Sequence, residues 1–169
     1  MHLSIWSAPT AIENEKVKLL FEDGKEFIKK QKDFFDVIIL DLSDPEGPAL
    51  DLITQEFYQD VKDALKKDGI VSIQSGSLTH QPEVTSTIYK RVSKIFPYVK
   101  IHKAVIPTYQ AGEFSFTVAS KSNLDKVTLE KIQQRYEKLK LNLKYYNPQI
   151  HFASTVLPNY LKDLLPGLP

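Results

Sequence analysis

FDVIIL, at residues 35–40, is a nearly continuous apolar run with three β-branched side chains. Such a run predicts a strand that is buried on both faces, as in a parallel sheet. The loop that follows, residues 41–48 (DLSDPEGP), is rich in Pro and carries a Gly. A second apolar run, IVSIQ at residues 70–74, predicts another buried strand.

The flanking sequence alternates helix and strand patterns. KVKLLF, at residues 16–21, predicts a further strand that ends at EDG, residues 22–24. Apolar residues at helical spacing predict helices over residues 25–31, 52–65, 82–96, 129–139 and 158–165, the second ending at Asp68-Gly69. Residues 99–106 and 114–119 predict a hairpin through Gly112. We therefore expect an α/β fold with a mostly parallel sheet and an antiparallel C-terminal hairpin.

The bulk composition bounds the class of protein. The 169 residues suffice for one domain, and 42% hydrophobic and 25% charged residues are ordinary for a globular chain. Because 22 basic residues are interspersed with 21 acids, the net charge is only +1 and no nucleic-acid partner is indicated. The chain has no cysteine, no membrane-spanning apolar run and no signal-peptide pattern. The expectation is a cytoplasmic protein without disulfides or a membrane partner.

Polar residues follow each predicted strand, where ligands bind in open α/β sheets. Asp23-Gly24 follows the first strand, Asp41-Leu42-Ser43-Asp44-Pro45 the second and Gln74-Ser75-Gly76 the third, and residues 107–112 (PTYQAG) precede the hairpin. Three carboxylates therefore converge on one edge, and no Gly-rich phosphate cradle accompanies them. A site lined with carboxylates suits a cationic ligand.

These motifs, in this order, resemble the spermidine synthases and other polyamine aminopropyltransferases. The resemblance rests on EDG at residues 22–24, DLSDPEGP at 41–48, Gln74, IPTYQAG at 106–112, and a tail with YYNP at 145–148, His151 and VLP at 156–158. It covers nearly the whole chain and implies a Rossmann-like, methyltransferase-type catalytic domain, here a single partial domain over residues 1–169. The activity that it implies is transfer of an aminopropyl group from decarboxylated S-adenosylmethionine, as co-substrate, to an amine such as putrescine.

The resemblance assigns the amine side of the site to four residues. An alkyl ammonium, with a pKa of about 10, must lose a proton before it attacks. Asp41 is implied as the catalytic residue that accepts this proton. Asp44 is expected to hold an ammonium end of the substrate, Tyr109 to hydrogen-bond the incoming amine, and Gln74 to orient it.

The nucleoside side falls on the other matching positions. Asp23 is implied to accept from the adenine amino group beside the Gly24 backbone, and Pro48 and Leu50 to wall the adenine. No metal or other cofactor is implied, and His80, His102 and His151 have no metal-ligand spacing. The family also implies self-association as a dimer or tetramer.

Single positions have simpler interpretations. Asp23 is equally suited to capping the helix that follows it. Asp44-Pro45 is a common turn starter. Gln74 and Tyr109 are compatible with backbone hydrogen bonding and with packing. The ordered set, rather than any one residue, supports the resemblance.

The chain departs from the family pattern in its first part. The family's Gly-rich loop and ribose-binding acid normally precede the 16–21 strand, and Glu13 and Glu15 do not match that acid. Two strands that normally lie between the 16–21 and 35–40 strands are then missing, leaving a gap of about 14 Å or unpaired edges. A fragment, completion by another chain, and direct re-pairing of the surviving strands are the three alternatives.

Three functional hypotheses follow. The first is an aminopropyltransferase whose activity is impaired in this chain by itself. The second is a catalytically inactive homologue that acts as a binding or assembly module. An ordinary methyltransferase is a weaker third candidate, because its loop after the second strand would not carry Asp-x-x-Asp-Pro.

Overall fold

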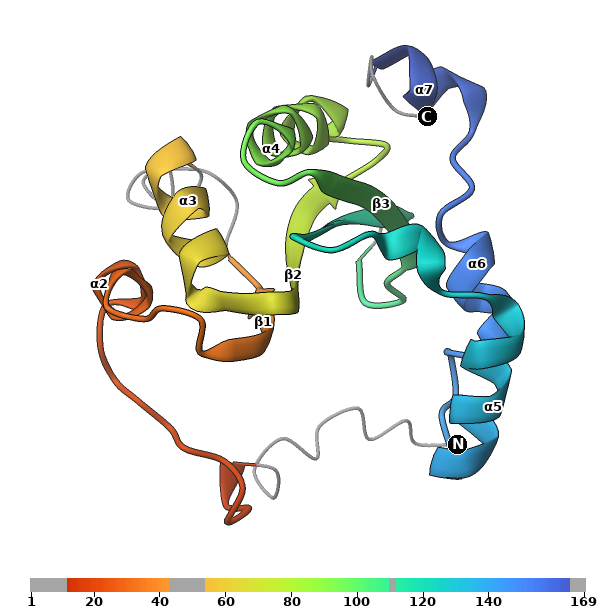
Figure 1. The fold of residues 1–169 in the computed structure, drawn as a ribbon. Helices are drawn as coiled ribbons and strands as arrows, with labels where there is room; N and C mark the ends of the chain where they lie inside the picture. The colour runs from red at the N-terminus through yellow and green to blue at the C-terminus, as the bar shows by residue number, and fades with distance from the viewer. Residues whose placement is uncertain (1–11, 43–53, 110–111, 165–169) are drawn as a thin grey trace.

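The computed structural model describes residues 12–42, 54–109 and 112–164. Its centre is a four-stranded sheet in the order β1-β2-β4-β3, with strands β1 (Phe35–Leu40), β2 (Leu65–Ser77), β3 (Tyr98–Val105) and β4 (Glu113–Ser120) (Figure 1). β1 pairs with β2 in parallel, whereas β4 pairs antiparallel with both β2 and β3. The predicted α/β class and the antiparallel C-terminal hairpin are confirmed.

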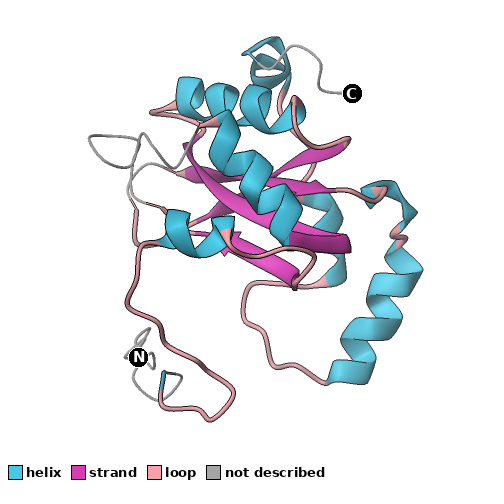
Figure 2. Ribbon diagram, turned by 60° about the vertical axis from the view of Figure 1, so that its left-hand side comes forward, coloured by secondary structure: helices cyan, strands magenta, loops and turns pink. Residues whose placement is uncertain are grey.

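Helices cover one face of this sheet (Figure 2). The helices on this face are α2 (Gly24–Lys29), α3 (Gln55–Ala64) and α4 (Pro82–Ser93). Later in the chain come the short η2 (Leu124–Lys126), α5 (Leu129–Leu139), α6 (Pro148–Ala153) and α7 (Asn159–Leu164). The main core lies between the first three helices and the sheet. It includes Phe57 and Val61 of α3, Val71 and Ile73 of β2, and Val92 of α4. Fully burying each such side chain contributes about 1.5–3 kcal/mol.

Local sequence signals explain where several helices begin. The side chains of Thr54 and Thr128 accept hydrogen bonds from the backbone N–H groups of Phe57 and Lys131, and so cap α3 and α5. Pro82 begins α4, where its missing N–H costs no hydrogen bond. The α6 helix was not predicted, although Asn147 before Pro148 is an N-cap followed by proline at the first helical position.

The end of the second helix was predicted too late. α3 ends at Ala64, and Leu65 already pairs with Phe35 in the sheet. The register shifts between this pair and the next, Val37 with Ile70, so residues 66–69 form an irregularity inside β2. A Cβ on Gly69 would lie 2.9 Å from the Phe35 carbonyl oxygen. Gly69 therefore allows close approach of two strands instead of ending a helix.

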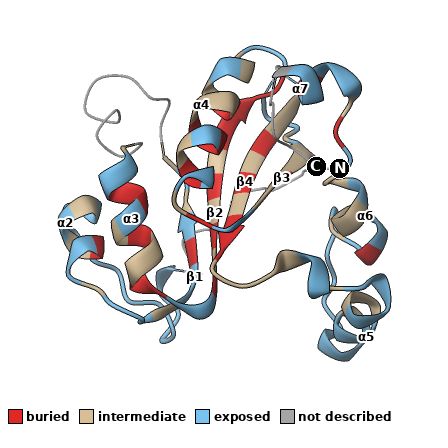
Figure 3. Ribbon diagram, turned by 45° about the horizontal axis from the view of Figure 1, so that its top comes forward, coloured by how far each residue is buried: buried red, intermediate tan, exposed pale blue. Residues whose placement is uncertain are grey.

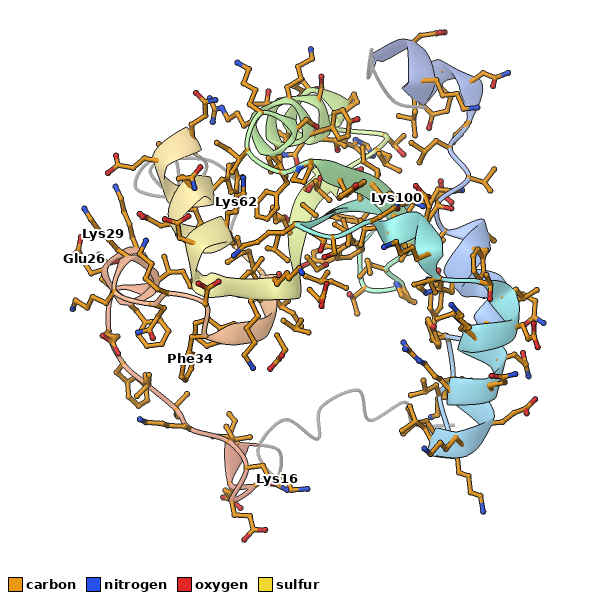
Figure 4. All side chains as sticks on the ribbon, in the orientation of Figure 1. Lys16, Glu26, Lys29, Phe34, Lys62 and Lys100 are labelled. Atoms are coloured by element: carbon orange, nitrogen blue, oxygen red, sulfur yellow. The ribbon has the colours of Figure 1, made fainter. Side chains whose placement is uncertain are left out.

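Residues 16–21 do not form the predicted strand. They pair with no strand among the described residues, and Phe21 is 91% exposed. Figures 1 and 4 show this segment, with Lys16, standing away from the sheet. A strand needs a neighbour to satisfy its backbone groups, and apolar character alone does not supply one. Direct re-pairing of this segment with β1 is therefore ruled out in the described residues.

β1 was predicted to be buried on both faces, and this is wrong in the structure. Ile38 packs in the core, but Val37 and Ile39, which point to the opposite face, are 58% and 74% exposed. Much of β1 is accordingly pale blue in Figure 3. In the described part of the chain β2 is the only neighbour of β1, so its other edge is unpaired.

The C-terminal elements pack at the β3 side of the molecule. Leu157 and Leu161 join Tyr89 of α4 and Ile101 of β3 in a second apolar cluster. By contrast, α5 contains no buried residue, and it contacts α6. Within the described residues, no helix combines the length and the apolar character that a membrane span requires.

Candidate active site at the carboxyl edge of the sheet

The pairing of the two parallel strands β1 and β2 determines where Asp41 and Gln74 lie. Leu40 of β1 is paired with Ile73 of β2, and Asp41 and Gln74 are the next residue of each strand line. Neighbouring strands lie about 4.8 Å apart, and side chains alternate between faces. Asp41 therefore lies on the same face of the sheet as Val37 and Ile39. Gln74 lies on that face too, one strand away. Asp41 is exposed and Gln74 is half-buried.

β2 changes its path immediately after Gln74. Gln74 pairs with Phe116 of β4, but the next pair is Ser77 with Phe114, so the ladder is irregular between them. Gly76 has φ +85°, a left-handed conformation that favours glycine. This bend ends the regular strand at the predicted site residue.

A buried hydroxyl network holds the bend. The Thr85 hydroxyl of α4 donates to the Ser75 carbonyl at 2.8 Å. The Ser115 hydroxyl of β4 lies 2.8 Å from the Thr85 hydroxyl and donates to the Gly76 carbonyl at 3.2 Å. The Ser75 hydroxyl in turn lies 2.8 Å from the Thr117 hydroxyl. The carbonyl oxygens of the bend are thus satisfied by α4 and β4, which fixes where Gln74 leaves the strand.

Tyr109 lies in a turn that follows β3. Its backbone N–H donates to the Ile106 carbonyl at 3.0 Å, and its ring packs against Phe114 at a tilt of 34° with 4.8 Å between centroids. It is nevertheless 59% exposed. β3 runs parallel to β2, because both are antiparallel to β4. The end of β3, and with it Tyr109, therefore belongs to the same edge as Asp41 and Gln74.

Asp23 caps α2. One carboxylate oxygen accepts from the Lys25 N–H at 2.8 Å and from the Glu26 N–H at 3.4 Å. The capping role weighed from the sequence is therefore confirmed. The residue is exposed, and its neighbour Gly24 has open space where a Cβ would lie. A nucleoside-binding role for Asp23 and Gly24 stays a prediction.

The remaining predicted residues are not placed. Asp44, Pro48 and Leu50 lie outside the described residues. A cavity of about 580 Å³ lies elsewhere, between the end of α4, β3 and residues 155–162, and no predicted site residue lines it. The chemistry predicted from the sequence and this cavity therefore do not coincide.

Two of the histidines that lack metal-ligand spacing in the sequence lie together in the structure. The rings of His102 on β3 and His151 on α6 have centroids 5.7 Å apart. Burial, with smaller contributions from His151 and Lys100, lowers the pKa of His102 to about 4. Burial also lowers the pKa of His151. The pair is therefore neutral at neutral pH, and spacing along the chain gave no sign of it.

Comparison with known proteins identifies the family of the chain. A family model described as the spermine/spermidine synthase domain matches residues 2–131. The chain belongs to the spermine/spermidine synthase family. Polyamine aminopropyltransferase 1 of Bacillus cereus is 37% identical over 155 residues, which are 92% of this chain and 54% of that relative.

Solved structures of the spermine/spermidine synthase family share the fold. A spermidine synthase in complex with the transition-state analogue AdoDATO matches with a TM-score of 0.84 and 35% identity, over 92% of this chain and 53% of that one. The spermidine synthase from Thermotoga maritima matches with a TM-score of 0.82 and 35% identity, over 92% and 52%. The chain thus spans about half the length of these relatives.

Proposed function

We propose that this chain supplies the amine side of an aminopropyltransferase site, and that the transfer runs from decarboxylated S-adenosylmethionine to a small polyamine such as putrescine. The observation that supports the proposal is the placement of Asp41 and Gln74 one residue beyond paired, parallel Leu40 and Ile73. A carboxylate and an amide on one face can receive a proton from an ammonium group and orient the resulting amine.

In this reaction the amine nitrogen forms a bond to the aminopropyl carbon, and the bond from that carbon to sulfur breaks. The proton leaves the attacking ammonium group for Asp41, and the electron pair goes to sulfur. Because the leaving thioether is neutral, no general acid is required. Tyr109 contributes a hydrogen bond to the amine and Asp44 an ion pair to its far end. Positioning the neutral amine in line is then the main task of these residues.

The nucleoside would lie toward Asp23 and Gly24, with Pro48 and Leu50 against the adenine. The family resemblance assigns the ribose to a Gly-rich loop and an acid that these 169 residues do not match. We therefore expect the chain by itself to transfer slowly. We further propose that residues 1–169 act as one partial catalytic domain, in a protein that self-associates as a dimer or tetramer in the cytoplasm.

An alternative function is an inactive assembly module. It is favoured by the unpaired edge of β1 in the described residues and by the exposed Val37 and Ile39 beside it. Such an edge can pair with a strand of another polypeptide. The two functions differ in whether completing the fold restores turnover.

The test is a transfer assay with decarboxylated S-adenosylmethionine and a panel of putrescine, cadaverine, agmatine and spermidine. Methylthioadenosine release is followed for the chain alone and for a chimera joined to the segment of the Bacillus cereus relative that the chain lacks. We expect slow transfer from the chain and acceptor-dependent transfer from the chimera. A folded chimera that binds methylthioadenosine but transfers to no acceptor would support the assembly module and overturn the proposal.

A further inference from the structure

β3 is the outer strand of the described sheet, and the C-terminal segment satisfies part of its outer edge. The Lys103 N–H donates to the Ser154 carbonyl at 2.8 Å, and the Val105 N–H donates to the Tyr145 hydroxyl at 3.3 Å. These two residues are alternate positions of β3, so both N–H groups point away from β4. The edge is covered by one carbonyl and one side chain from residues 145–154.

The Ser154 end of this contact is anchored by several groups. The Ser154 hydroxyl donates to the His151 carbonyl at 2.7 Å. Since a hydroxyl has one proton, the Nδ1–H of His102, 2.8 Å away, must donate to Ser154. The Tyr146 hydroxyl lies 3.2 Å from Nδ1 of His151. α6 is thus fixed on β3 by contacts that do not involve Tyr145.

The Tyr145 end of the contact is different, because it stands next to the candidate site. Val105 is the last residue of β3, and Ile106 follows it as the first residue of the turn that carries Tyr109. The Tyr109 N–H closes that turn on the Ile106 carbonyl. Movement of Val105 is therefore passed through one peptide unit to the start of the turn.

We propose that Tyr145 is a positioning residue for Tyr109. Its hydroxyl holds the end of β3, and the held strand end sets where the Tyr109 ring meets the acceptor amine. The proposal rests on the proposed aminopropyl transfer for its functional consequence, whereas the mechanical coupling from Tyr145 to Tyr109 stands on the hydrogen bonds alone.

Tyr145 is not needed to explain the stability of the fold. Val105 and Tyr145 are both about half exposed, and a single hydrogen bond contributes about 0.5–1.5 kcal/mol. The buried cluster of Leu157 and Leu161, together with the His102 contact, holds the C-terminal segment independently. Loss of the Tyr145 hydroxyl should consequently act on the turn rather than on the whole molecule.

The test uses Tyr145→Phe, which keeps the ring and removes the hydroxyl. The control is Tyr160→Phe on α7, because Tyr160 is similarly exposed. Amide hydrogen exchange is measured at Val105 and Tyr109 in the 169-residue chain, together with its thermal melting. We expect protection at both amides to fall about fivefold in Tyr145→Phe while the melting temperature falls by no more than about 4 °C, and no change in the control.

A second readout separates this proposal from the proposed function. In a transfer-competent chimera, Tyr145→Phe should raise the KM for the acceptor amine and leave the KM for decarboxylated S-adenosylmethionine unchanged. If no chimera transfers, the proposed function fails while the exchange result still decides the coupling. Lost protection at Val105 with full protection at Tyr109 would overturn the coupling. An equal rise in KM for both substrates, together with a melting temperature lowered by clearly more than about 4 °C, would show a merely structural role and would overturn the proposal as well.

Discussion

Asp41 and Gln74 occupy equivalent positions on two parallel strands, each one residue past the pair formed by Leu40 and Ile73. The strand pairing places them on one face and one edge without any contact between their side chains being required. The edge also includes the turn of Tyr109.

Asp23 should have two separable roles. Asp23→Ser replaces the carboxylate by another good N-cap, so the free energy of unfolding should change by only a few tenths of a kcal/mol. The shorter side chain no longer reaches a ligand, and affinity for methylthioadenosine should fall about tenfold in a calorimetric titration of the chimera. Asp23→Ala should lower affinity similarly and also destabilise the protein by about 0.5–2 kcal/mol. Unchanged affinity in Asp23→Ser would leave the cap as the only role.

The hydroxyl network at the bend after Gln74 should be costly to interrupt. Thr85→Val keeps the shape of the side chain but leaves the buried Ser75 carbonyl without the Thr85 donor. We expect a loss of about 1–3 kcal/mol in urea unfolding. Thr79→Val, at an exposed position two residues past β2, should change stability by less than about 0.5 kcal/mol. Equal effects of the two substitutions would contradict a structural role for the network.

The local signals in the sequence were sufficient for most elements. Apolar spacing predicted α5 with the observed bounds, and Gly112 predicted the turn of the hairpin. These features depend on residues close together in the chain. The environment of Val37 and Ile39 could not be predicted in this way, because the burial of a strand face depends on which elements are available to cover it.

The candidate site was likewise predictable only in part from the sequence. Asp41, Gln74 and Tyr109 were found as residues following strands, and the structure places them at one edge. The bend after Gln74 depends on Thr85 and Ser115, which are 30 residues apart and are not linked by any sequence pattern. The contact between Val105 and Tyr145 spans 40 residues. Only the folded chain brings such pairs together.

Acid should weaken the packing of α6 on β3. His102 takes up a proton near pH 4 in the native state, but near 6.5 in the unfolded chain. Between these values the unfolded state binds more protons, so stability rises with pH and is lost as pH falls from about 6.5 toward 4. The depressed pKa of His102 corresponds to a loss of at most about 3 kcal/mol.

Urea unfolding over this pH range measures the effect. His102→Gln can still hydrogen-bond Ser154 and cannot gain the charge, so its stability should depend less on pH. His80→Gln, at an exposed histidine, should leave the pH dependence as it is. The same pH dependence in His102→Gln as in the natural sequence would argue against His102 as the source.

The rate of aminopropyl transfer in Asp41→Asn tests the proposed chemistry most directly. The control is Asp36→Asn on the same strand, where Asp36 is exposed and pairs with Lys66 at 2.8 Å. In the transfer-competent chimera, Asp41→Asn should lower kcat about 10²–10⁴-fold while melting and methylthioadenosine affinity stay unchanged, and Asp36→Asn should retain full turnover. Equal turnover in the two variants would contradict the assignment of Asp41 as the residue that receives the amine proton.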